Sequence, residues 1–525
     1  MDPRRCEVAQ QEIRSGDGQV RPGVGLDYDV ARIASVDKLH ARAVGLPGVL
    51  FLVLTGSAPI AAMLYNVPVQ VGFGEGRYAP ASYVVATLIL LVFSVGYAAM
   101  ARKVTAAGGF YSYISHGLGR EVGMAMGCAA VMAYSVFEAA LAGGFAYFTT
   151  LKLSEFGISI AWPWLSLAMV LVISILAYFD VKLSAIVLGV GLVTEVLIML
   201  VFDAGIFGHA GAGAHVDATV LNPINAFAGF PAHAHLTAGV AGIGLFFAFW
   251  SYVGFEMAPN YGEESRNPKR IVPLSLYISV LGLGVFYTVT SWAAVSGYPS
   301  ADAAIRQAQT HSDLFFAAPA RRFAGAWVWE LISYLILTSS FACAMAFHNT
   351  AARYFYALGR EGLLWSRLGK THARYRSPYV ASIAQTCIAA LIVVLFAVFA
   401  GSNDASTQAY LELFGLMSIL GVIAILAAQA LVSVAILVYF ERSHPNDVRW
   451  WNTRIAPVIA FVSQAVVLYL LLSQIQFFGA GYGLANWLAP IVLVIFLLGL
   501  GGAFYLKAKD PAKYEKIGHL IYEGV

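Results

Sequence analysis

The run Thr55-Gly56-Ser57-Ala58-Pro59 interrupts an otherwise apolar stretch from residue 46 to 69. Its flanks, residues 48–54 and 60–65, are apolar enough to lie in lipid, but its middle suits a continuous helix poorly. Pro59 has no N–H, its ring crowds the carbonyl of Thr55, and it biases Ala58 away from helical angles. Irregular backbone at membrane depth persists only where it is buried in protein or lines a wet cavity. The stretch therefore predicts either a broken membrane helix beside such a cavity or an ordinary proline kink.

The composition is that of a membrane protein. Hydrophobic residues are 59% of the 525 and charged residues 12%, whereas about a quarter of a typical soluble domain is charged. The chain opens Met1-Asp2-Pro3-Arg4-Arg5 and stays polar to about Arg42, so we expect a cytosolic tail rather than a signal peptide. The cysteines are scattered without metal-ligand spacing, which predicts reduced thiols and no metal site. They are Cys6, Cys128, Cys343 and Cys387.

Twelve apolar spans are long enough to cross a bilayer, so the expected fold is an all-α polytopic membrane protein. We divide the chain into a tail over 1–44, spans one to six within 45–265, spans seven to ten within 266–440, two more spans within 441–506, and a tail over 507–525. The spans run near residues 46–69, 79–101, 120–150, 161–179, 183–203, 236–258, 272–297, 326–352, 378–400, 408–439, 454–475 and 485–506.

The distribution of basic residues predicts the orientation. With the N-terminus inside, the inner segments and both tails hold 27 of the 32 Lys and Arg residues, and the outer loops hold five. Those five are Arg77, Lys152, Arg306, Arg321 and Arg322. Cytoplasmic loops of membrane proteins carry an excess of Lys and Arg, so we expect both termini in the cytosol.

The layout of the spans indicates an inverted repeat. The sixth span contains a second weak point, Trp250-Ser251-Tyr252-Val253-Gly254-Phe255-Glu256, which corresponds to the break in the first span if each unit has five spans. Because five is odd, the second unit would enter the membrane from the opposite side. Short helices are expected in the inner loop 108–116 and in the outer loop 302–316, at positions that the inversion relates.

Three motifs resemble those of amino-acid permeases of the amino acid–polyamine–organocation superfamily. They are Gly254-Phe255-Glu256 followed by Glu263-Glu264-Ser265-Arg266-Asn267-Pro268, the loop from Arg353 to Leu364, and Ala107-Gly108-Gly109-Phe110-Tyr111. The resemblance covers roughly residues 45–505 and implies a LeuT-type fold of ten core helices plus two. The first span departs from it, because Ala58-Pro59 stands where a glycine is usual. The loop from Arg353 departs at its end, where Leu364 stands in place of a usual proline.

A zwitterionic amino acid needs donors for its carboxylate and acceptors for its ammonium. Free amides around Ser57, Ala58 and Ile60 suit the carboxylate, and free carbonyls near Leu54 and in the sixth-span break suit the ammonium. The aromatic side chains of that break would cover the substrate or act as gates, or they would simply pack in the bundle. The candidate substrate-binding residues are Thr55, Gly56, Ser57, Ala58, Ile60, Phe249, Trp250, Ser251, Tyr252 and Gly254.

Three residues are candidates for ion coupling. Glu195 lies mid-span in the fifth span, and an ionisable group in such a place is a functional candidate or a structural hydrogen-bond partner. In some proton-coupled members of the family a lysine occupies what looks like this position. Ser339 and Ser340 align with the family's second ion position. Alternatively, they are small residues that allow two membrane helices to pack closely.

Glu138, in the third span, is a further candidate substrate-binding residue. A carboxylate there could bind a cationic side chain or a second ammonium of the substrate. Alternatively, the carboxyl group could be protonated and serve as a hydrogen-bond partner. Glu256 is expected at the inner gate. The loop histidines His209, His215, His233 and His235 fit no regular metal site.

These observations predict a secondary transporter, not an enzyme, that imports an amino acid or related amine by alternating access. A proton is the expected coupling ion and Na⁺ the alternative. An amine or polyamine exchanger or uniporter of the same fold, a channel, and a nutrient receptor stay open. No ATP-binding motif, cofactor site or nucleic-acid partner is expected, and the expected location is the cell membrane with both termini inside.

Overall fold

The computed structural model describes residues 44–105, 108–179, 181–233, 235–399, 404–479 and 481–518. The predicted N-terminal tail, with Cys6, lies outside these residues up to residue 43, as do Ala107 and the end of the C-terminal tail. Every regular element in the described part is a helix, and the expected all-α class is confirmed. The helices are α2 (Leu46–Gly56), α3 (Pro59–Phe73), α4 (Ala79–Ala101), α5 (Gly109–Leu118), α6 (Arg120–Ser154), α7 (Trp162–Tyr178), α8 (Val181–Phe207), α9 (Ile243–Ser251), α10 (Pro268–Ser296), α11 (Ala301–Thr310), α12 (Ala317–Pro319), α13 (Ala326–Arg360), α14 (Tyr379–Phe399), α15 (Ala405–Thr407), α16 (Met417–Ser443), α17 (Ala456–Ser473), α18 (Ile475–Phe478), α19 (Ala485–Lys509) and α20 (Pro511–Lys516).

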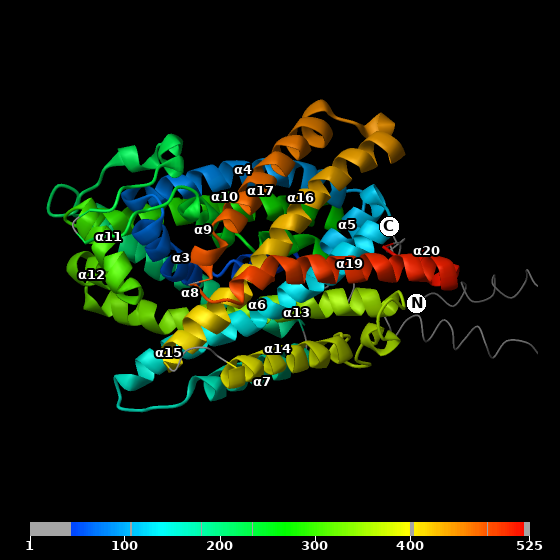
Figure 1. The fold of residues 1–525 in the computed structure, drawn as a ribbon, viewed down its shortest axis with the longest axis horizontal. Coiled ribbons are helices and arrows are strands. Elements are labelled where there is room, and N and C mark those ends of the chain that lie inside the picture. The colour runs from blue at the N-terminus through cyan, green and yellow to red at the C-terminus, as the bar shows by residue number, and fades with distance from the viewer. Residues whose placement is uncertain are drawn as a thin grey trace, which may run out of the picture.

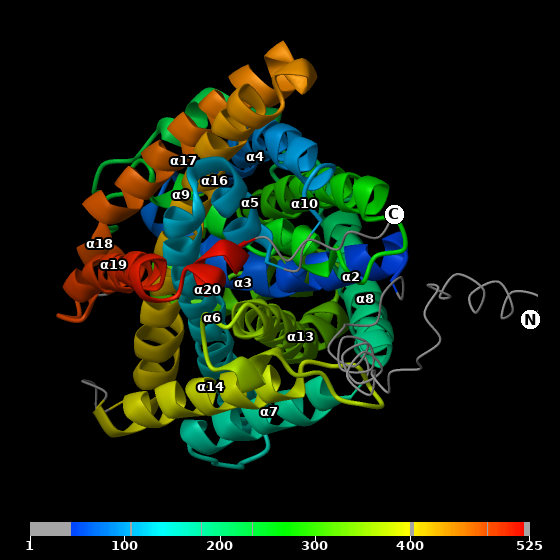
Figure 2. The same cartoon turned by 90° about the vertical axis from the view of Figure 1, so that its right-hand side faces the viewer.

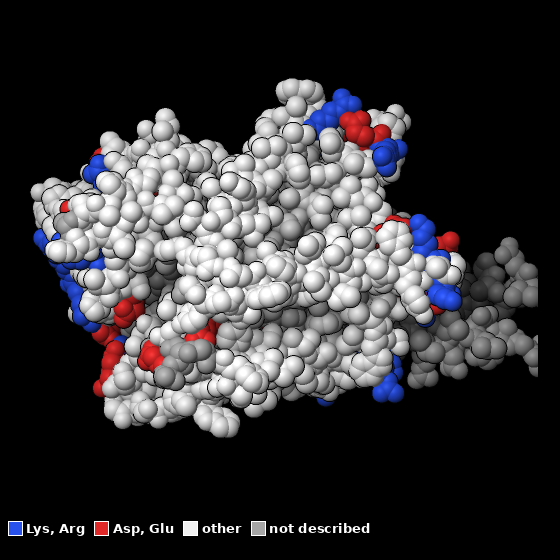
Figure 3. Space-filling model, viewed as in Figure 1, with Lys and Arg blue, Asp and Glu red and all other residues white. Residues whose placement is uncertain are grey.

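Each of the twelve predicted spans corresponds to a helix or to a broken pair of helices. Ten segments of the described chain are long and apolar enough to cross a membrane, the first of them being α2 and α3 together. The fourth span, α7, is a shorter apolar helix, and the sixth is interrupted after α9. Charged side chains gather at the two ends of the face in Figure 3, with a broad uncharged band between them. That distribution suits a bundle whose middle faces lipid.

The break in the first span is present, and it is a true interruption rather than a kink. Helix α2 ends at Gly56, and α3 begins at Pro59 after Ala58, whose φ of 41° and ψ of 74° are left-handed. Such angles are unfavourable for a residue with a Cβ, so the surrounding packing must hold them.

The sixth span breaks in a related way. Helix α9 ends at Ser251, and a 3₁₀ helix, η6 (Phe255–Tyr261), follows Gly254, whose φ is 122°. A Cβ added at Gly254 would lie 2.6 Å from the carbonyl carbon of Gly56. The two breaks therefore meet backbone to backbone, and only glycine allows this approach.

The two short loop helices lie at opposite ends of the bundle. Figure 1 shows α5 near α20 at one end and α11 at the other, which agrees with the predicted inversion of the two loops. Viewed along the long axis, α3 lies near the centre with α6 and α13 close by, while α7 and α14 pack together at one edge (Figure 2). The broken helices are thus enclosed by the rest of the bundle.

Candidate substrate site

A small cavity of about 50 Å³ lies where the two helix breaks meet. From the first break it is lined by Gly56, Ser57 and Ala58, and from the second by Trp250 and Ser251. Its remaining lining is mostly apolar or aromatic and consists of Ala61, Ala62, Tyr65, Asn66, Phe137, Leu141, Val253, Cys343, Phe347, Phe414 and Ser418. No acidic or basic side chain is among these lining residues, all of which lie in the described part of the chain.

Tyr287 on α10 joins the two breaks. Its hydroxyl lies 2.9 Å from the carbonyl oxygen of Ser57 and 2.9 Å from that of Ser251. A phenolic hydroxyl has one proton to donate, so it satisfies one carbonyl at a time. The other carbonyl keeps its capacity to accept a hydrogen bond at the edge of the cavity, as an ammonium group would require.

Glu195, from α8, caps the N-terminus of α3. Ser339 Oγ donates to the Glu195 carboxylate over 2.7 Å, and the backbone amide of Ile60 also donates to it. The same Ser339 oxygen accepts from the amide of Ala61 over 3.4 Å. The first-turn amide of Ile60, which the sequence assigned to a substrate carboxylate, is therefore occupied by a carboxylate of the protein itself.

The cavity is covered by an aromatic cluster on the side of the α11 end. Trp250 stacks on Phe414 with 6.1 Å between ring centroids, and Phe414 packs against Tyr65 at 4.5 Å. Beyond these rings lies a second cavity of about 450 Å³, lined by Trp250, Phe414, Phe73 and Gln309 among others. The two cavities share lining residues, so this second cavity, the vestibule, lies directly beside the smaller one on the other side of the aromatic cluster.

The opposite side of the site is closed by buried ion pairs. Arg353 on α13 forms an ion pair with Glu264, in which Nη2 lies 2.8 and 3.1 Å from the two carboxylate oxygens. Arg360 pairs with Glu263, with 2.8 Å between Nη2 and Oε1. These residues come from two of the motifs on which the family resemblance rests. Nearby, Tyr134 donates to Glu256 over 3.0 Å. The structure is closed at the α5 end and has its vestibule at the α11 end.

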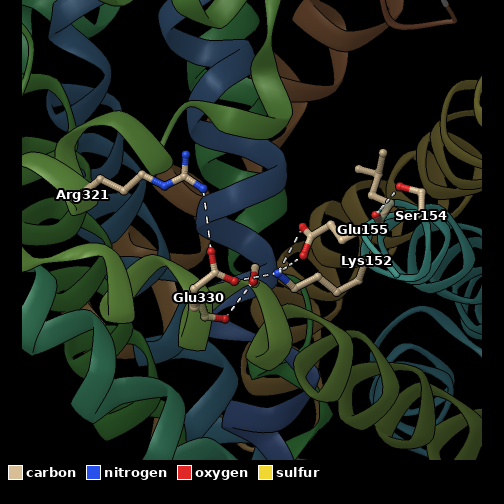
Figure 4. Close-up of polar contacts among 7 residues, drawn as sticks. Lys152, Ser154, Glu155, Arg321 and Glu330 are labelled. Carbon is tan, nitrogen blue, oxygen red and sulfur yellow. Dashed lines mark hydrogen bonds and ion pairs between the residues drawn. The ribbon is translucent and has the colours of Figure 1, made fainter. Parts of the chain in front are cut away.

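At the α11 end, α6 and α13 are joined by an ion network. Lys152 lies between Glu155 at 2.9 Å and Glu330 at 2.8 Å, and Arg321 approaches Glu330 at 3.7 Å (Figure 4). The side chains of Glu155, Arg321 and Glu330 are about half exposed, and no residue of the network is in the lining of either cavity, so the network joins the helix ends away from the site.

Several predicted residues lie near the site but outside the lining of the smaller cavity. Thr55, Ile60, Phe249, Tyr252 and Gly254 are all buried beside it. Ser340 bonds to the Tyr65 hydroxyl at 2.9 Å, so it is separated from the Ser339–Glu195 pair with which the sequence grouped it. Glu138 points away from the cavity, towards α13 and α14, where it contacts His348 and Gln385.

Most of the apolar and aromatic lining was not singled out from the sequence, and neither were two polar residues of this region, His348 and Tyr287. His348 lies within the predicted eighth span, and an ionisable side chain there was a signal that could have been used. Tyr287 offered no comparable signal, because a tyrosine in an apolar span is ordinary until its hydroxyl is located.

Comparisons with known proteins agree with this geometry. Residues 45–500 match the family model described as amino acid permease. The chain belongs to this family. A branched-chain amino acid permease of Lactococcus lactis is 26% identical over 62% of this chain and 70% of its own length, and one of Bacillus subtilis is 23% identical over 83% and 86%. A low-affinity putrescine importer of Escherichia coli is 22% identical over 61% and 68%. The resemblance seen in the motifs is confirmed, and the chain is a multi-pass membrane permease, a transporter of amino acids or amines and not an enzyme.

Proposed function

We propose that this permease moves a neutral amino acid across the cell membrane by alternating access, together with a proton. The observation that carries the proposal is the cavity at the junction of the two helix breaks. Its polar groups are mainly backbone groups and hydroxyls, which suit the invariant ends of an amino acid, and its walls are apolar. We place the vestibule on the external side, so the described state is one that receives substrate from outside.

The absence of charge in the lining supports a neutral side chain. A cationic side chain or a second ammonium buried here would need a carboxylate partner to offset its lost hydration. Glu138 faces α13 and α14, and Glu195 is engaged at the N-terminus of α3. Phe137, Leu141 and Phe347 present an apolar wall that suits an aliphatic side chain.

Glu195 supplies a mechanism for coupling to protons. Its charge at the N-terminus of α3 satisfies the positive end of that helix, where a substrate carboxylate would also be attracted. A proton on Glu195 removes one of these two competing negative charges. Proton and substrate would therefore favour each other's binding, which is the thermodynamic requirement for symport.

A ligand screen on purified protein tests the proposal. A ligand raises the melting temperature by mass action when it binds the folded state alone. We expect L-leucine or L-alanine to stabilise the protein, and L-lysine and putrescine to have no effect. The variant Ala62→Leu fills the cavity wall and should abolish the shift, whereas Ala204→Leu, at an exposed position on α8, should keep it. Stabilisation by putrescine alone would contradict the neutral amino acid, and stabilisation of Ala62→Leu equal to that of the wild type would place the site elsewhere.

A further inference from the structure

A second buried ionisable pair lies behind the wall of the cavity. Glu138 on α6 and His348 on α13 are both fully buried, and Nδ1 of His348 lies 2.9 Å from Oε2 of Glu138. Gln385 on α14 donates to the same carboxylate oxygen over 2.7 Å, and Ser135 donates to Gln385 over 2.6 Å. The proposed transport mechanism uses none of these groups.

The hydrogen bonds around the pair suit two protonation states. Nε2 of His348 lies 2.8 Å from Ser382 Oγ, and a serine hydroxyl can either donate or accept. When the imidazole is neutral, Nδ1–H donates to the carboxylate and Nε2 accepts from Ser382. When it is protonated, both ring nitrogens donate, and the Ser382 hydroxyl only turns. A proton can thus arrive or leave without any rearrangement of heavy atoms.

The charge balance favours binding a proton here. With a neutral imidazole the pair carries one buried negative charge, and with an imidazolium it is a neutral ion pair. A single charge in a dry interior is costly, so the protein gains from taking up the proton. The second carboxylate oxygen, Oε1 of Glu138, has no hydrogen-bond partner among the described residues, which leaves the charge incompletely compensated.

Other ionisable side chains within two turns on the packed helices are engaged elsewhere or exposed. Arg353 pairs with Glu264, and Tyr134 bonds to Glu256. Cys343 donates to the Gly56 carbonyl over 3.0 Å, and Tyr354 accepts from the Phe110 amide.

On α14, the groups that face the pair are Ser382 and Gln385. Cys387 is exposed, and Tyr379 packs against Tyr178 and His372. On α7, Ser174 bonds to Thr386 and Tyr178 packs in that same aromatic group.

The pair is joined to the cavity through its immediate neighbours in sequence. Phe137 precedes Glu138 and Phe347 precedes His348, and both phenylalanines line the cavity. Their rings stack with centroids 4.8 Å apart and an interplanar angle of 26°. Any change in the attraction between Glu138 and His348 acts on the spacing of α6 and α13, and hence on this wall.

We infer that Glu138 and His348 form a proton-binding site, distinct from Glu195, whose occupancy adjusts the Phe137–Phe347 wall and so the affinity for substrate. The second part of this inference rests on the proposed function, whereas the first does not. The proton draws the two helices together as an ion pair, and the wall is then set for substrate. Histidine is the side chain whose charge ordinarily changes between about pH 5 and 8, so this is the range over which the site is tested.

The first part is tested without any ligand. Solid-state ¹⁵N NMR of proteoliposomes with histidine-labelled protein reports the charge of each imidazole, and His348→Gln assigns the signal that disappears. We expect the His348 imidazole to gain a proton between about pH 5 and 8. Glu138→Gln should weaken its proton affinity by at least about tenfold, because the carboxylate charge is lost, and Ser382→Ala should shift it without removing it. An imidazole whose charge stays constant over this range would overturn the inference.

The second part uses L-leucine as the probe, in a Glu195→Gln background that removes the other proposed proton site. The affinity for L-leucine should fall by about tenfold from about pH 6 to pH 8, and His348→Gln should abolish that dependence. His444→Gln, at the end of α16, is the matched control and should leave it intact. An unchanged pH profile in His348→Gln would show a purely structural pair. If L-leucine binds no form of the protein, the proposed substrate class is wrong, and the NMR result still decides the proton site.

Discussion

The carboxylate of Glu195 holds the N-terminus of α3 at the same place where a substrate carboxylate would be attracted. It is buried and bonded to Ser339 and to the Ile60 amide, so its charge is stabilised by hydrogen bonds rather than by a basic side chain. Hydrogen bonds of this kind can hold either a charged or a protonated carboxyl group. The proposed proton coupling therefore depends on one side chain that can gain or lose a proton without moving.

Glu195→Gln should separate binding from coupling. The amide has the shape of a protonated carboxyl group, so the variant should bind substrate as well as the wild type or better. It should lose accumulation driven by a pH gradient, while exchange of internal for external substrate survives because exchange needs no net proton movement. The measurement is uptake and counterflow in proteoliposomes. Glu515→Gln, at an exposed position, is the control, and gradient-driven accumulation by Glu195→Gln would refute the assignment.

Glu75 offers a test of buried charge outside the spans. It connects Leu46–Phe73 to Gly76–Ala101, accepts a hydrogen bond from Ser82, and lies against Gly244 at the start of α9. Burial raises the pKa of this carboxyl group from its ordinary 4.5 to about 8. The folded protein then holds a proton that the unfolded chain has released between these pH values. The stability that protonated Glu75 contributes to the folded protein is complete below about pH 4.5 and is lost as the pH rises through about 8.

The expected consequence is a melting temperature of the wild type that falls with rising pH in this window. The underlying slope from this one group is about 1.4 kcal/mol per pH unit. Glu75→Gln keeps the acceptor for Ser82 and cannot ionise, so its melting temperature should depend less on pH and exceed that of the wild type near pH 8. Equal pH dependence in both proteins would mean that Glu75 is ionised throughout.

Among the structural elements, the two helix breaks form the candidate site because they touch. Proline and glycine made the first break predictable, and the weak run around Gly254 made the second one predictable. Their contact was not predictable, because it depends on long-range packing between residues about 200 positions apart, such as Ser57 and Tyr252, whose side chain and carbonyl are joined at 3.4 Å. The partners of the predicted carboxylates were also unpredictable, since spacing along one helix does not say which neighbouring helix a side chain faces.

Gly254→Ala should separate the breaks. The added Cβ would lie 2.6 Å from the Gly56 carbonyl carbon and 2.8 Å from the Ser57 nitrogen, and a φ of 122° disfavours any side chain. Since backbone on both sides must move, we expect a loss of more than about 2 kcal/mol in stability together with loss of ligand binding. Gly501→Ala, in open space on α19, should be neutral or slightly stabilising in the same thermal unfolding assay. Wild-type stability and binding in Gly254→Ala would contradict the close contact.

In the whole molecule, α5 and α20 lie at one end of the bundle and α11 at the other (Figure 1), and charged side chains gather at both ends (Figure 3). The skew of Lys and Arg predicts that the α20 end is cytosolic, and the proposal of an external vestibule rests on this predicted orientation. The spans and their order could be read from hydropathy, since lipid-facing helices must be apolar. The closed state of the α5 end could not be predicted from hydropathy, because it depends on the contact between Arg353 and Glu264, which come from separate parts of the chain.

Cysteine labelling on intact cells tests the orientation. A cysteine placed at Ala212, in the exposed loop after α8, should react with an impermeant maleimide, and one placed at Ala512, exposed on α20, should react only after the cells are opened. Cys128, Cys343 and Cys387 lie within the spans and should give little background, and the unmodified protein measures the labelling of Cys6, in the tail predicted to be cytosolic, once the cells are opened. Labelling of Ala512→Cys but not Ala212→Cys on intact cells would reverse the orientation and the direction of access.

Uptake of radiolabelled L-leucine into proteoliposomes under separate proton and sodium gradients tests proton-coupled transport of a neutral amino acid. We expect accumulation above the external concentration when the outside is acidic, with sodium absent from both sides, and collapse of that accumulation when a protonophore is added. Unlabelled L-leucine should compete and putrescine should not. Accumulation that needs a sodium gradient and ignores the pH gradient, or transport of putrescine in place of L-leucine, would contradict this proposed function.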